Sequence, residues 1–201
     1  NPYVTYDNNF IESEWWALKQ IFEKKLLYKG FKIVPYCPRC GTPLSSHEVA
    51  QGYKAVKERS AVVRFKVVGE DAYFLAWTTT PWTLPANSAL AVNPNMVYLR
   101  MQDTDGAVYV IAESRLRAYE KQFANTTEVG RITGAELAGM HYTPLFPYYV
   151  GQSDLLYQVI PADYVSDSDG TGIVHIAPAY GADDFWAAKN IDAKFPVLLN
   201  V

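Results

Sequence analysis

Three short stretches of this 201-residue chain hold the side chains whose types and spacing could support chemistry. They are CPRCG at residues 37–41, WTTTPWTLPAN at residues 77–87, and GTGIVHIAPAYGADD at residues 170–184. Each places thiols, hydroxyls, an imidazole or carboxylates beside the glycine and proline residues that end regular structure. Each stretch is therefore a candidate site on a loop or at a strand end.

The first stretch pairs the chain's two cysteines, Cys37 and Cys40. Two thiolates at this spacing on a glycine-ended turn can supply two of the four ligands of a tetrahedral zinc site. The sequence has no second cysteine pair, and its histidines are His47, His141 and His175. We therefore expect half of a structural zinc site, and the alternative is an incidental turn. Two cysteines exclude a disulfide framework.

The second stretch places three hydroxyls at the end of an expected strand. Alternation along AYFLAWTTT puts Thr78 and Thr80 on one face and Thr79 on the other, and Pro81 ends the pairing. Such hydroxyls can hold a carbonyl oxygen or a ribose hydroxyl, and Trp82 offers a ring on which a base can stack. The alternative is a purely structural role, because threonines are common in strands and prolines end edge strands.

The third stretch predicts a strand, a turn and the start of a helix. In the strand GIVHIA, Ile173, His175 and Ala177 share one face, and Asp183 follows at the helix start, next to Asp184. The structural alternative is that an aspartate caps the helix and that the histidine is a satisfied polar side chain, and of the two aspartates we assign the cap to Asp183 and the functional role to Asp184.

The composition is that of a globular protein, with 49% hydrophobic residues, 18 basic against 21 acidic residues and a net charge of −3. This balance gives no general attraction for nucleic acid, although a local basic patch would suffice. The sequence has no membrane-spanning run and no signal-peptide pattern at its start, so we expect a soluble, cytoplasmic protein. It begins with Asn1 and stops within the apolar run PVLLNV, which suggests an excised piece of a longer protein.

The elements that must position these stretches fall into two regions. Residues 9–29 read as an amphipathic helix that Asn9 caps and Gly30 ends, followed by a strand at FKIV and the cysteine knuckle. We place a boundary after Leu44. Residues 1–44 form the first region and residues 45–201 the second.

The second region consists mainly of short strands separated by turn residues. AVVRFKVV and AYFLAWTTT predict one hairpin, and MVYLRMQ and AVYVIA, joined by DTDG, predict another. DLLYQVI, DYVS and GIVHIA read as further strands, and residues 114–123 and 183–191 as helices. The expected fold class is therefore mostly β with peripheral helices (α+β), with a β-barrel-like core.

Together, WTTTPWTLPAN and GTGIVHIAPAYGADDF resemble the editing domain inserted into the catalytic core of class I isoleucyl-tRNA synthetases. NPYVTYDNNFIESEWWALKQIFEKKLLYKG and PYCPRCGTPLSSHEVAQGY resemble the segment that leads into this insertion, so the resemblance covers essentially the whole chain. The valyl and leucyl enzymes carry related insertions that look like GTGAV followed by PAHD-type loops, whereas this chain has the isoleucine pattern. It lacks the HIGH and KMSKS signatures, so aminoacylation and ATP binding would belong to the full-length synthetase only.

The resemblance implies an aminoacyl-tRNA ester hydrolase that deacylates Val-tRNA(Ile), with valyl-adenylate as a second candidate substrate, and that excludes isoleucine. One methylene gives a hydrophobic pocket only about 1–3 kcal/mol of discrimination, a figure for which isoleucyl-tRNA synthetase is itself the standard example. We expect attack by a positioned water, helped by the terminal ribose hydroxyl, in place of covalent catalysis.

The resemblance also implies roles for nine residues. Asp184 would hold the substrate's α-ammonium group, kept ionised by the helix start, and His175 would exclude isoleucine by its bulk. The other seven would contact the ester and terminal adenosine or shape the pocket: Thr78, Thr79, Thr80, Trp82, Thr83, Asn87 and Tyr180. We count Asp184, Thr79 and Thr80 as the catalytic group.

The implied partners are the 3′ end of tRNA(Ile) carrying valine and the rest of the synthetase chain, with no membrane partner and a monomeric state. Editing would need no cofactor, and zinc at Cys37 and Cys40 would belong to the full-length protein. Two alternatives remain open. One is a tRNA-binding insertion without catalysis, and the other is the editing domain of a valyl- or leucyl-type paralogue.

Overall fold

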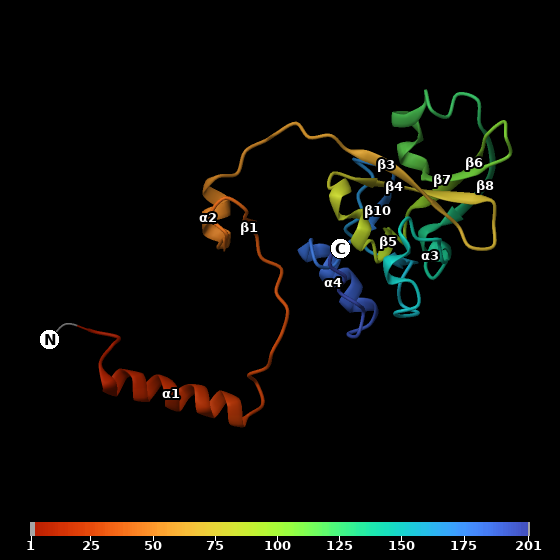
Figure 1. Cartoon of the computed structure of the whole chain (residues 1–201). Coiled ribbons are helices and arrows are strands. Elements are labelled where there is room, and N and C mark those ends of the chain that lie inside the picture. The colour runs from red at the N-terminus through yellow and green to blue at the C-terminus, as the bar shows by residue number, and fades with distance from the viewer. Residues whose placement is uncertain (1–2, 201) are drawn as a thin grey trace. The chain divides into compact units, whose positions relative to one another are not determined.

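The computed structural model describes residues 3–200, and the chain divides into two compact units, Asn1–Val34 and Pro35–Val201 (Figure 1). The boundary expected after Leu44 falls inside the second unit, and a domain border at that point stays a prediction.

The first unit holds one helix, α1 (Asn8–Glu23). The carboxylate of Asp7 caps it by accepting a hydrogen bond from the backbone N–H of Asn9 at 2.9 Å. The helix ends at Glu23 because Lys25 adopts φ 57°, outside the right-handed helical region. The prediction of a helix over residues 9–29 capped by Asn9 was therefore wrong at both ends.

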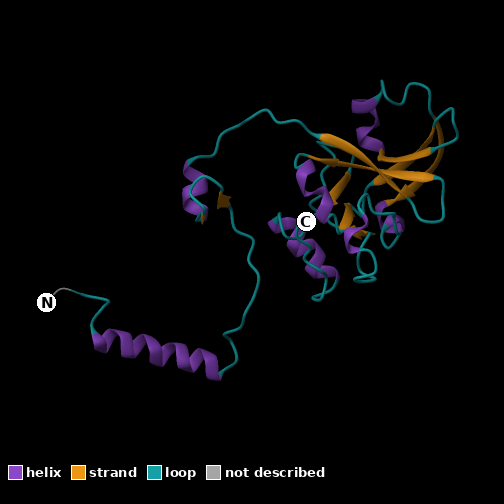
Figure 2. Ribbon diagram, in the orientation of Figure 1, coloured by secondary structure: helices purple, strands orange, loops and turns teal. Residues whose placement is uncertain are grey.

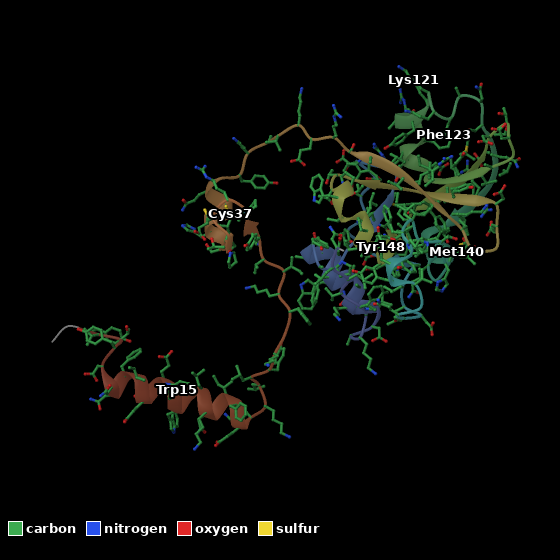
Figure 3. All side chains as sticks on the ribbon, in the orientation of Figure 1. Trp15, Cys37, Lys121, Phe123, Met140 and Tyr148 are labelled. Atoms are coloured by element: carbon green, nitrogen blue, oxygen red, sulfur yellow. The ribbon has the colours of Figure 1, made fainter. Side chains whose placement is uncertain are left out.

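No residue of α1 is buried, and its side chains, with Trp15 among them, project from the helix (Figure 3). The strand predicted at FKIV, residues 31–34, is absent, because no other segment of this unit's described residues pairs with it. Of the helices described in residues 3–200, none has the length and apolar character needed to cross a lipid bilayer.

The second unit begins with the cysteine knuckle. β1 (Tyr36–Cys37) and β2 (Thr42–Pro43) pair antiparallel across the CPRCG turn. α2 (Ser46–Gln51) follows, and Ser45 and Glu48 close a reciprocal capping box at its start.

Eight strands form the main sheet, which curls into a half-barrel (Figure 2). They are β3 (Ala61–Lys66), β4 (Ala72–Thr78), β5 (Ala89–Val92), β6 (Val97–Gln102), β7 (Val108–Ala112), β8 (Thr127–Thr133), β9 (Gln158–Pro161) and β10 (Ile173–Ile176). Short helical segments connect them: η1 (Pro81–Ala86), η2 (Glu113–Tyr119), α3 (Gly134–Leu137), η3 (Pro147–Tyr149) and α4 (Ala182–Ile191). The predicted α+β class with a barrel-like core is confirmed.

The strand order is β8-β6-β7-β4-β10-β5-β9, with β3 paired to β4. Both predicted hairpins, β3–β4 and β6–β7, are present as antiparallel pairs. The order inserts β10 between β4 and β5, antiparallel to β5 and parallel to β4, where Val174 lies beside Trp77. This insertion joins two segments that are distant in the sequence.

Several other predictions needed correction. DYVS, residues 163–166, forms a turn in place of a strand, and DLLYQVI contributes only to the strand Gln158–Pro161. The helix predicted over residues 114–123 is the shorter 3₁₀ segment η2, whereas the predicted helix at 183–191 is present as α4. β5 and β8 were missed: ALAV is buried at every position and so shows no alternation, and TEVGRIT contains a glycine.

The core of this unit consists of three clusters of buried side chains. The largest fills the concave side of the sheet with Phe65, Phe74, Tyr98 and Tyr142. A second lies between β5, β9, β10 and α4 and includes Ile176. Because β10 is packed by both clusters, its side chains are held rigidly.

Candidate active site

The end of β4 and the middle of β10 border one cavity of about 240 Å³. It is lined by Trp77, Thr78, Thr79, Thr80, Thr83, Val174, His175, Tyr180, Gly181 and Asp184. This volume lies below the roughly 300–1,000 Å³ of pockets that bury drug-sized ligands. The cavity suits an amino-acid side chain and its ester better than a whole nucleotide.

Seven of the nine residues predicted from the second and third stretches line this cavity. Trp82 and Asn87 do not. Trp82 is 63% exposed, and its backbone carbonyl accepts a hydrogen bond from Asn200 Nδ2 at 2.9 Å. Asn87 is buried and contacts His175 instead.

The threonines form a connected set of hydrogen bonds. The backbone N–H of Thr80 donates to Thr78 Oγ1 at 3.0 Å, and the Thr83 hydroxyl donates to the Thr80 carbonyl at 2.8 Å. The Thr80 hydroxyl lies 3.4 Å from that of Thr78 and 3.3 Å from that of Thr83. Thr78 and Thr80 therefore face the same side, as the alternation predicts, while Thr79 is exposed. The long contacts leave the Thr80 hydroxyl able to bond a ligand.

Hydrogen bonds fix both the orientation and the tautomer of His175. Asn87 Nδ2 donates to the Ala89 carbonyl at 3.0 Å, and Asn87 Oδ1 accepts from the Tyr142 hydroxyl at 2.6 Å, so the amide can point only one way. The same Nδ2 lies 2.8 Å from His175 Nδ1, which must therefore be the acceptor. The proton then resides on Nε2, which donates to Thr83 Oγ1 at 3.0 Å.

His175 is consequently neutral and fully engaged. Burial lowers the pKa of its imidazole to about 4, so the ring carries no charge at neutral pH. Both ring nitrogens already have partners, which leaves neither free to take a proton from a water. The ring is therefore suited to form a wall of the cavity and unsuited to act as a general base.

Asp184 supplies the cavity's carboxylate from the first turn of α4. Its Oδ2 accepts a hydrogen bond from the backbone N–H of Ala177 at 2.9 Å, which joins α4 to the end of β10. Gly181, and not Asp183, occupies the N-cap position, and no side chain caps the helix. The assignment of the cap to Asp183 was therefore wrong, and Asp183 is an exposed residue of the first turn.

The Asp184 carboxylate is shielded from water and forms no ion pair with a described residue. Burial raises the pKa of the Asp184 carboxyl to about 6, and the nearby charge of Asp183 raises it further. The hydrogen bond from the Ala177 N–H acts in the opposite direction and lowers this pKa. Burial and these two aspartates also raise the pKa of the Tyr164 phenol, which stays neutral. No described lysine, arginine or histidine forms an ion pair with Asp184. A carboxylate removed from water without a cation is a place for a cationic ligand group.

Three lining residues were missed from the sequence: Trp77, Val174 and Gly181. Trp77 and Val174 are neighbours across the β4–β10 pairing, and strand alternation alone does not reveal which strands pair. The first glycine of GTG, Gly170, explains how the Trp77 ring packs against this turn. Gly170 has φ +65°, and a Cβ there would lie 2.8 Å from the Trp77 ring, so the glycine lets this wall of the cavity close.

The cysteine knuckle is a separate candidate metal centre. The backbone N–H of Cys40 donates to Cys37 Sγ at 3.4 Å, and this N–H is the main cause of a lowered pKa of the Cys37 thiol. Two thiols in this arrangement fit half of a zinc site. Within residues 3–200, no third histidine, cysteine or acidic residue joins them to make a group of metal ligands. The zinc site stays a prediction.

Solved structures with a similar fold define the class of domain. The crystal structure of GlLeuRS-CP1 matches with a TM-score of 0.57 at 19% identity, over 66% of this chain and 60% of that chain. The editing domain of cytosolic leucyl-tRNA synthetase from P. knowlesi matches with a TM-score of 0.55 at 16% identity, over 72% of this chain and 66% of that one. The fold is therefore that of leucyl-tRNA synthetase editing domains.

Sequence comparison then gives the family. A family model described as tRNA synthetases class I (I, L, M and V) matches residues 1–187, and the chain belongs to this family. Isoleucine–tRNA ligase of Clostridium kluyveri is 55% identical over 184 residues, which are 92% of this chain and 17% of that protein. The enzyme of Clostridium acetobutylicum is 54% identical over 201 residues, 100% of this chain and 19% of that protein. The chain thus spans less than a fifth of the length of these relatives.

Proposed function

We propose that this chain is the editing domain of an isoleucyl-tRNA synthetase and hydrolyses the ester of Val-tRNA(Ile), with valyl-adenylate as a second substrate. One observation carries the proposal. The half-buried Asp184 carboxylate, which forms no ion pair with any described residue, shares a cavity of amino-acid size with His175 and the threonine hydroxyls. An aminoacyl ester offers an α-ammonium group, a side chain and a carbonyl to these three groups.

In the proposed reaction, Asp184 binds the α-ammonium group and thereby fixes the aminoacyl moiety. The oxygen of a water bonds to the ester carbonyl carbon, and the carbonyl oxygen becomes an oxyanion. Hydroxyls of Thr79 and Thr80 are the donors available to stabilise it. Collapse of the tetrahedral intermediate breaks the bond to the ribose oxygen, which leaves with a proton, and valine is released.

We assign deprotonation of the attacking water to a hydroxyl of the tRNA substrate itself. His175 has no free nitrogen, and Asp184 is occupied by the ammonium group. The neighbouring hydroxyl of the terminal ribose is the remaining group that can orient the water and pass its proton to the leaving oxygen.

We assign the discrimination between valine and isoleucine to the part of the cavity wall that His175 forms. Thr83 and Asn87 hold the His175 ring in one position, so the space beside it cannot expand cheaply to accept another methylene. We propose that valine fits and that isoleucine is excluded by this ring, with Tyr180 as a weaker contributor at the exposed edge.

The same proposal sets the partners. They are the 3′ end of tRNA(Ile) and the rest of a cytoplasmic synthetase, whose activation of isoleucine with ATP lies outside this chain. The chain acts as a monomer, and zinc binds at Cys37 and Cys40 only when further ligands are supplied by the longer protein.

Deacylation assays test the proposal. The chain is incubated with Val-tRNA(Ile) at pH 7.5, and release of valine is compared for wild type, Asp184→Ala and the matched control Asp183→Ala, which removes the adjacent exposed carboxylate. We expect Asp184→Ala to abolish most of the release and Asp183→Ala to preserve it.

Three outcomes would contradict the proposal. Release that is insensitive to Asp184→Ala would remove the role of the carboxylate. A gel shift of tRNA without release of valine would indicate a binding insertion without catalysis. Faster release of threonine from Thr-tRNA(Val) than of valine from Val-tRNA(Ile) would indicate a valyl-type domain.

A further inference from the structure

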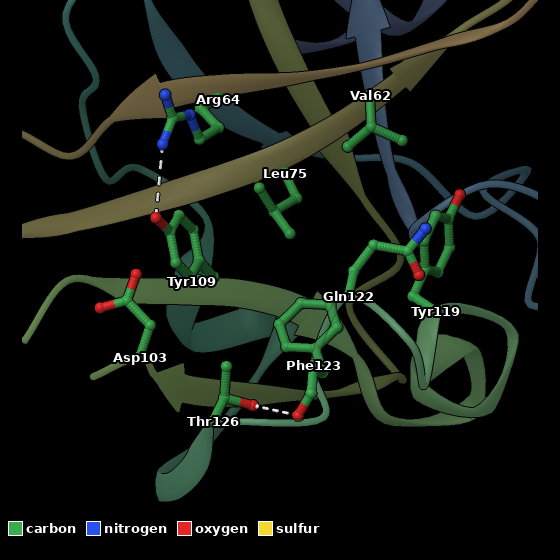
Figure 4. Close-up of a pocket in the computed structure, with 9 residues that line it drawn as sticks. All are labelled: Val62, Arg64, Leu75, Asp103, Tyr109, Tyr119, Gln122, Phe123 and Thr126. Carbon is green, nitrogen blue, oxygen red and sulfur yellow. Dashed lines mark hydrogen bonds between the residues drawn. The ribbon is translucent and has the colours of Figure 1, made fainter. Parts of the chain in front are cut away.

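A second, larger cavity of about 440 Å³ lies on another part of the sheet (Figure 4). It is formed by β3, β4, β7 and the segment that follows η2, and it shares no lining residue with the cavity at Asp184. Its volume falls within the roughly 300–1,000 Å³ of small-ligand pockets. The proposed hydrolysis makes no use of it.

Part of the wall of this cavity is apolar and aromatic. Leu75 forms part of a buried cluster, and Tyr109 and Phe123 pack against that cluster as partly buried rings. In the close-up, Leu75, Tyr109 and Phe123 point toward one another around the hollow (Figure 4). The Thr126 hydroxyl holds the backbone at Phe123 by donating to its carbonyl at 2.9 Å, so the ring has a fixed support. Aromatic walls of this kind suit a planar ligand.

The rim of the cavity carries hydrogen-bonding groups of both kinds. The Arg64 guanidinium donates to the Tyr109 hydroxyl at 3.3 Å and lies 5.7 Å from the centre of the Tyr73 ring. Within the described residues it forms no ion pair with a carboxylate, so its charge is available to an anion. Asp103 presents a carboxylate on the same side of the hollow as Arg64 and Tyr109, and Gln122 presents an exposed amide on the far side, beside Tyr119 (Figure 4). One side of the rim thus offers a cation and a carboxylate, and the other side offers an amide.

We propose that this cavity binds one unpaired nucleotide of the tRNA substrate, at a point separate from the 3′ end in the hydrolytic cavity. The base stacks between Tyr109 and Phe123, with Asp103 at one of its edges and Gln122 at the opposite edge, and Arg64 binds the adjoining phosphate. A paired base inside a duplex cannot enter, because its Watson–Crick edge is covered by its partner base and both of its faces are covered by stacked neighbours. The choice of RNA as occupant rests on the proposed function, and the pairing of a free arginine with two aromatic rings favours a nucleotide over an apolar side chain.

Direct binding measurements separate this proposal from hydrolysis. A single-stranded 12-nucleotide RNA with a 3′-phosphate is titrated into ¹⁵N-labelled Asp184→Ala chain, and the same sequence is titrated as a blunt duplex. We expect the single strand to shift the amide signals of Tyr109, Gln122 and Phe123, and the duplex to leave them unchanged. Because the hydrolytic residue is already absent, failure of the proposed hydrolysis would leave this result intact.

Two variants and two controls give the affinities, measured by fluorescence anisotropy. Phe123→Ala removes one stacking ring and is expected to weaken single-strand binding about 5- to 150-fold. Arg64→Gln changes an exposed strand residue, so folding is retained, and it is expected to reduce the slope of log K against log [salt] by about 1. Arg131→Gln, which removes an exposed arginine elsewhere, and Phe146→Ala, which removes an exposed ring elsewhere, should leave the affinity unchanged.

The proposal is overturned if the single strand does not bind or if the duplex shifts the same signals. It is also overturned if the shifts are confined to residues around the hydrolytic cavity. Equal affinity for wild type and Arg64→Gln, with an unchanged salt slope, would exclude the phosphate contact and with it the nucleotide.

Discussion

The carboxylate of Asp184 should give editing a characteristic dependence on pH. Burial raises its pKa to about 6, so the free enzyme loses the negative charge as the pH falls through that value. A protonated Asp184 no longer attracts the α-ammonium group. We therefore expect kcat/KM for Val-tRNA(Ile) to approach a tenfold fall per pH unit well below pH 6 and to rise by only about a quarter to a third between pH 6.5 and 7.5.

The variant Asp184→Asn checks the origin of this dependence. Hydrogen bonds to charged groups contribute about 1.5–3 kcal/mol, so kcat/KM at pH 7 should drop about 10- to 150-fold. The fall of kcat/KM at acid pH, which we call the acid limb of the profile, should disappear. Asp183→Asn removes the neighbouring charge outside the cavity and should keep both the rate and the limb. An acid limb that survives in Asp184→Asn would assign it to a different group.

The ring of His175 should decide which side chain enters. His175→Ala removes the wall that Thr83 and Asn87 hold in place, so we expect measurable release of isoleucine from Ile-tRNA(Ile), which wild type spares. The change also leaves two buried polar partners unmatched, at a cost of about 1–3 kcal/mol each in the free energy of unfolding. Urea unfolding therefore accompanies the assay. A folded variant that still releases valine and fully spares isoleucine would show that another residue excludes it.

At the scale of elements, the GTG turn before β10 positions the site through backbone geometry. Gly172 has φ +77°, and a Cβ added there would lie 2.3 Å from the Ala112 Cβ on β7. Gly172→Ala therefore combines backbone strain of about 1–2 kcal/mol with overpacking of about 1–3 kcal/mol. We expect the free energy of unfolding to decrease by about 2–5 kcal/mol, measured by urea denaturation.

Two further variants separate these two costs. Gly106→Ala also lies at positive φ, +89°, but has no atom within 4 Å of an added Cβ, so it should show the backbone cost alone. The double variant Gly172→Ala/Ala112→Gly removes the clash and should recover the overpacking part. If Gly172→Ala costs no more than Gly106→Ala, close packing against β7 is not the reason for the glycine.

The elements that could be predicted from sequence are those with local signals. Alternation and turn residues identified the β3–β4 and β6–β7 hairpins, and the helix after the GADD turn was correctly placed. The parallel contact between β4 and β10 joins Trp77 to Val174, and no local pattern encodes such a pairing. For the same reason Asn87 was expected in the cavity wall, whereas it lies behind His175, 88 residues away in sequence.

At the scale of the whole molecule, the two units differ in what they bury. The second unit has three clusters of buried side chains, while α1 in the first unit buries none and leaves Trp15 68% and Trp16 66% exposed. Large apolar surfaces of this kind normally contact another protein surface. The relatives that this chain matches are more than five times as long as the chain itself.

The cysteine knuckle gives a prediction about metal at this same scale. Cys37 and Cys40 supply two thiolates, whereas a structural zinc ion takes four ligands, and the described residues add no third. We therefore expect well below one zinc per chain after dialysis against a weak chelator, measured by elemental analysis. A longer chain that supplies the remaining ligands should retain one zinc and should lose it in Cys37→Ser. One tightly held zinc per 201-residue chain would contradict this prediction.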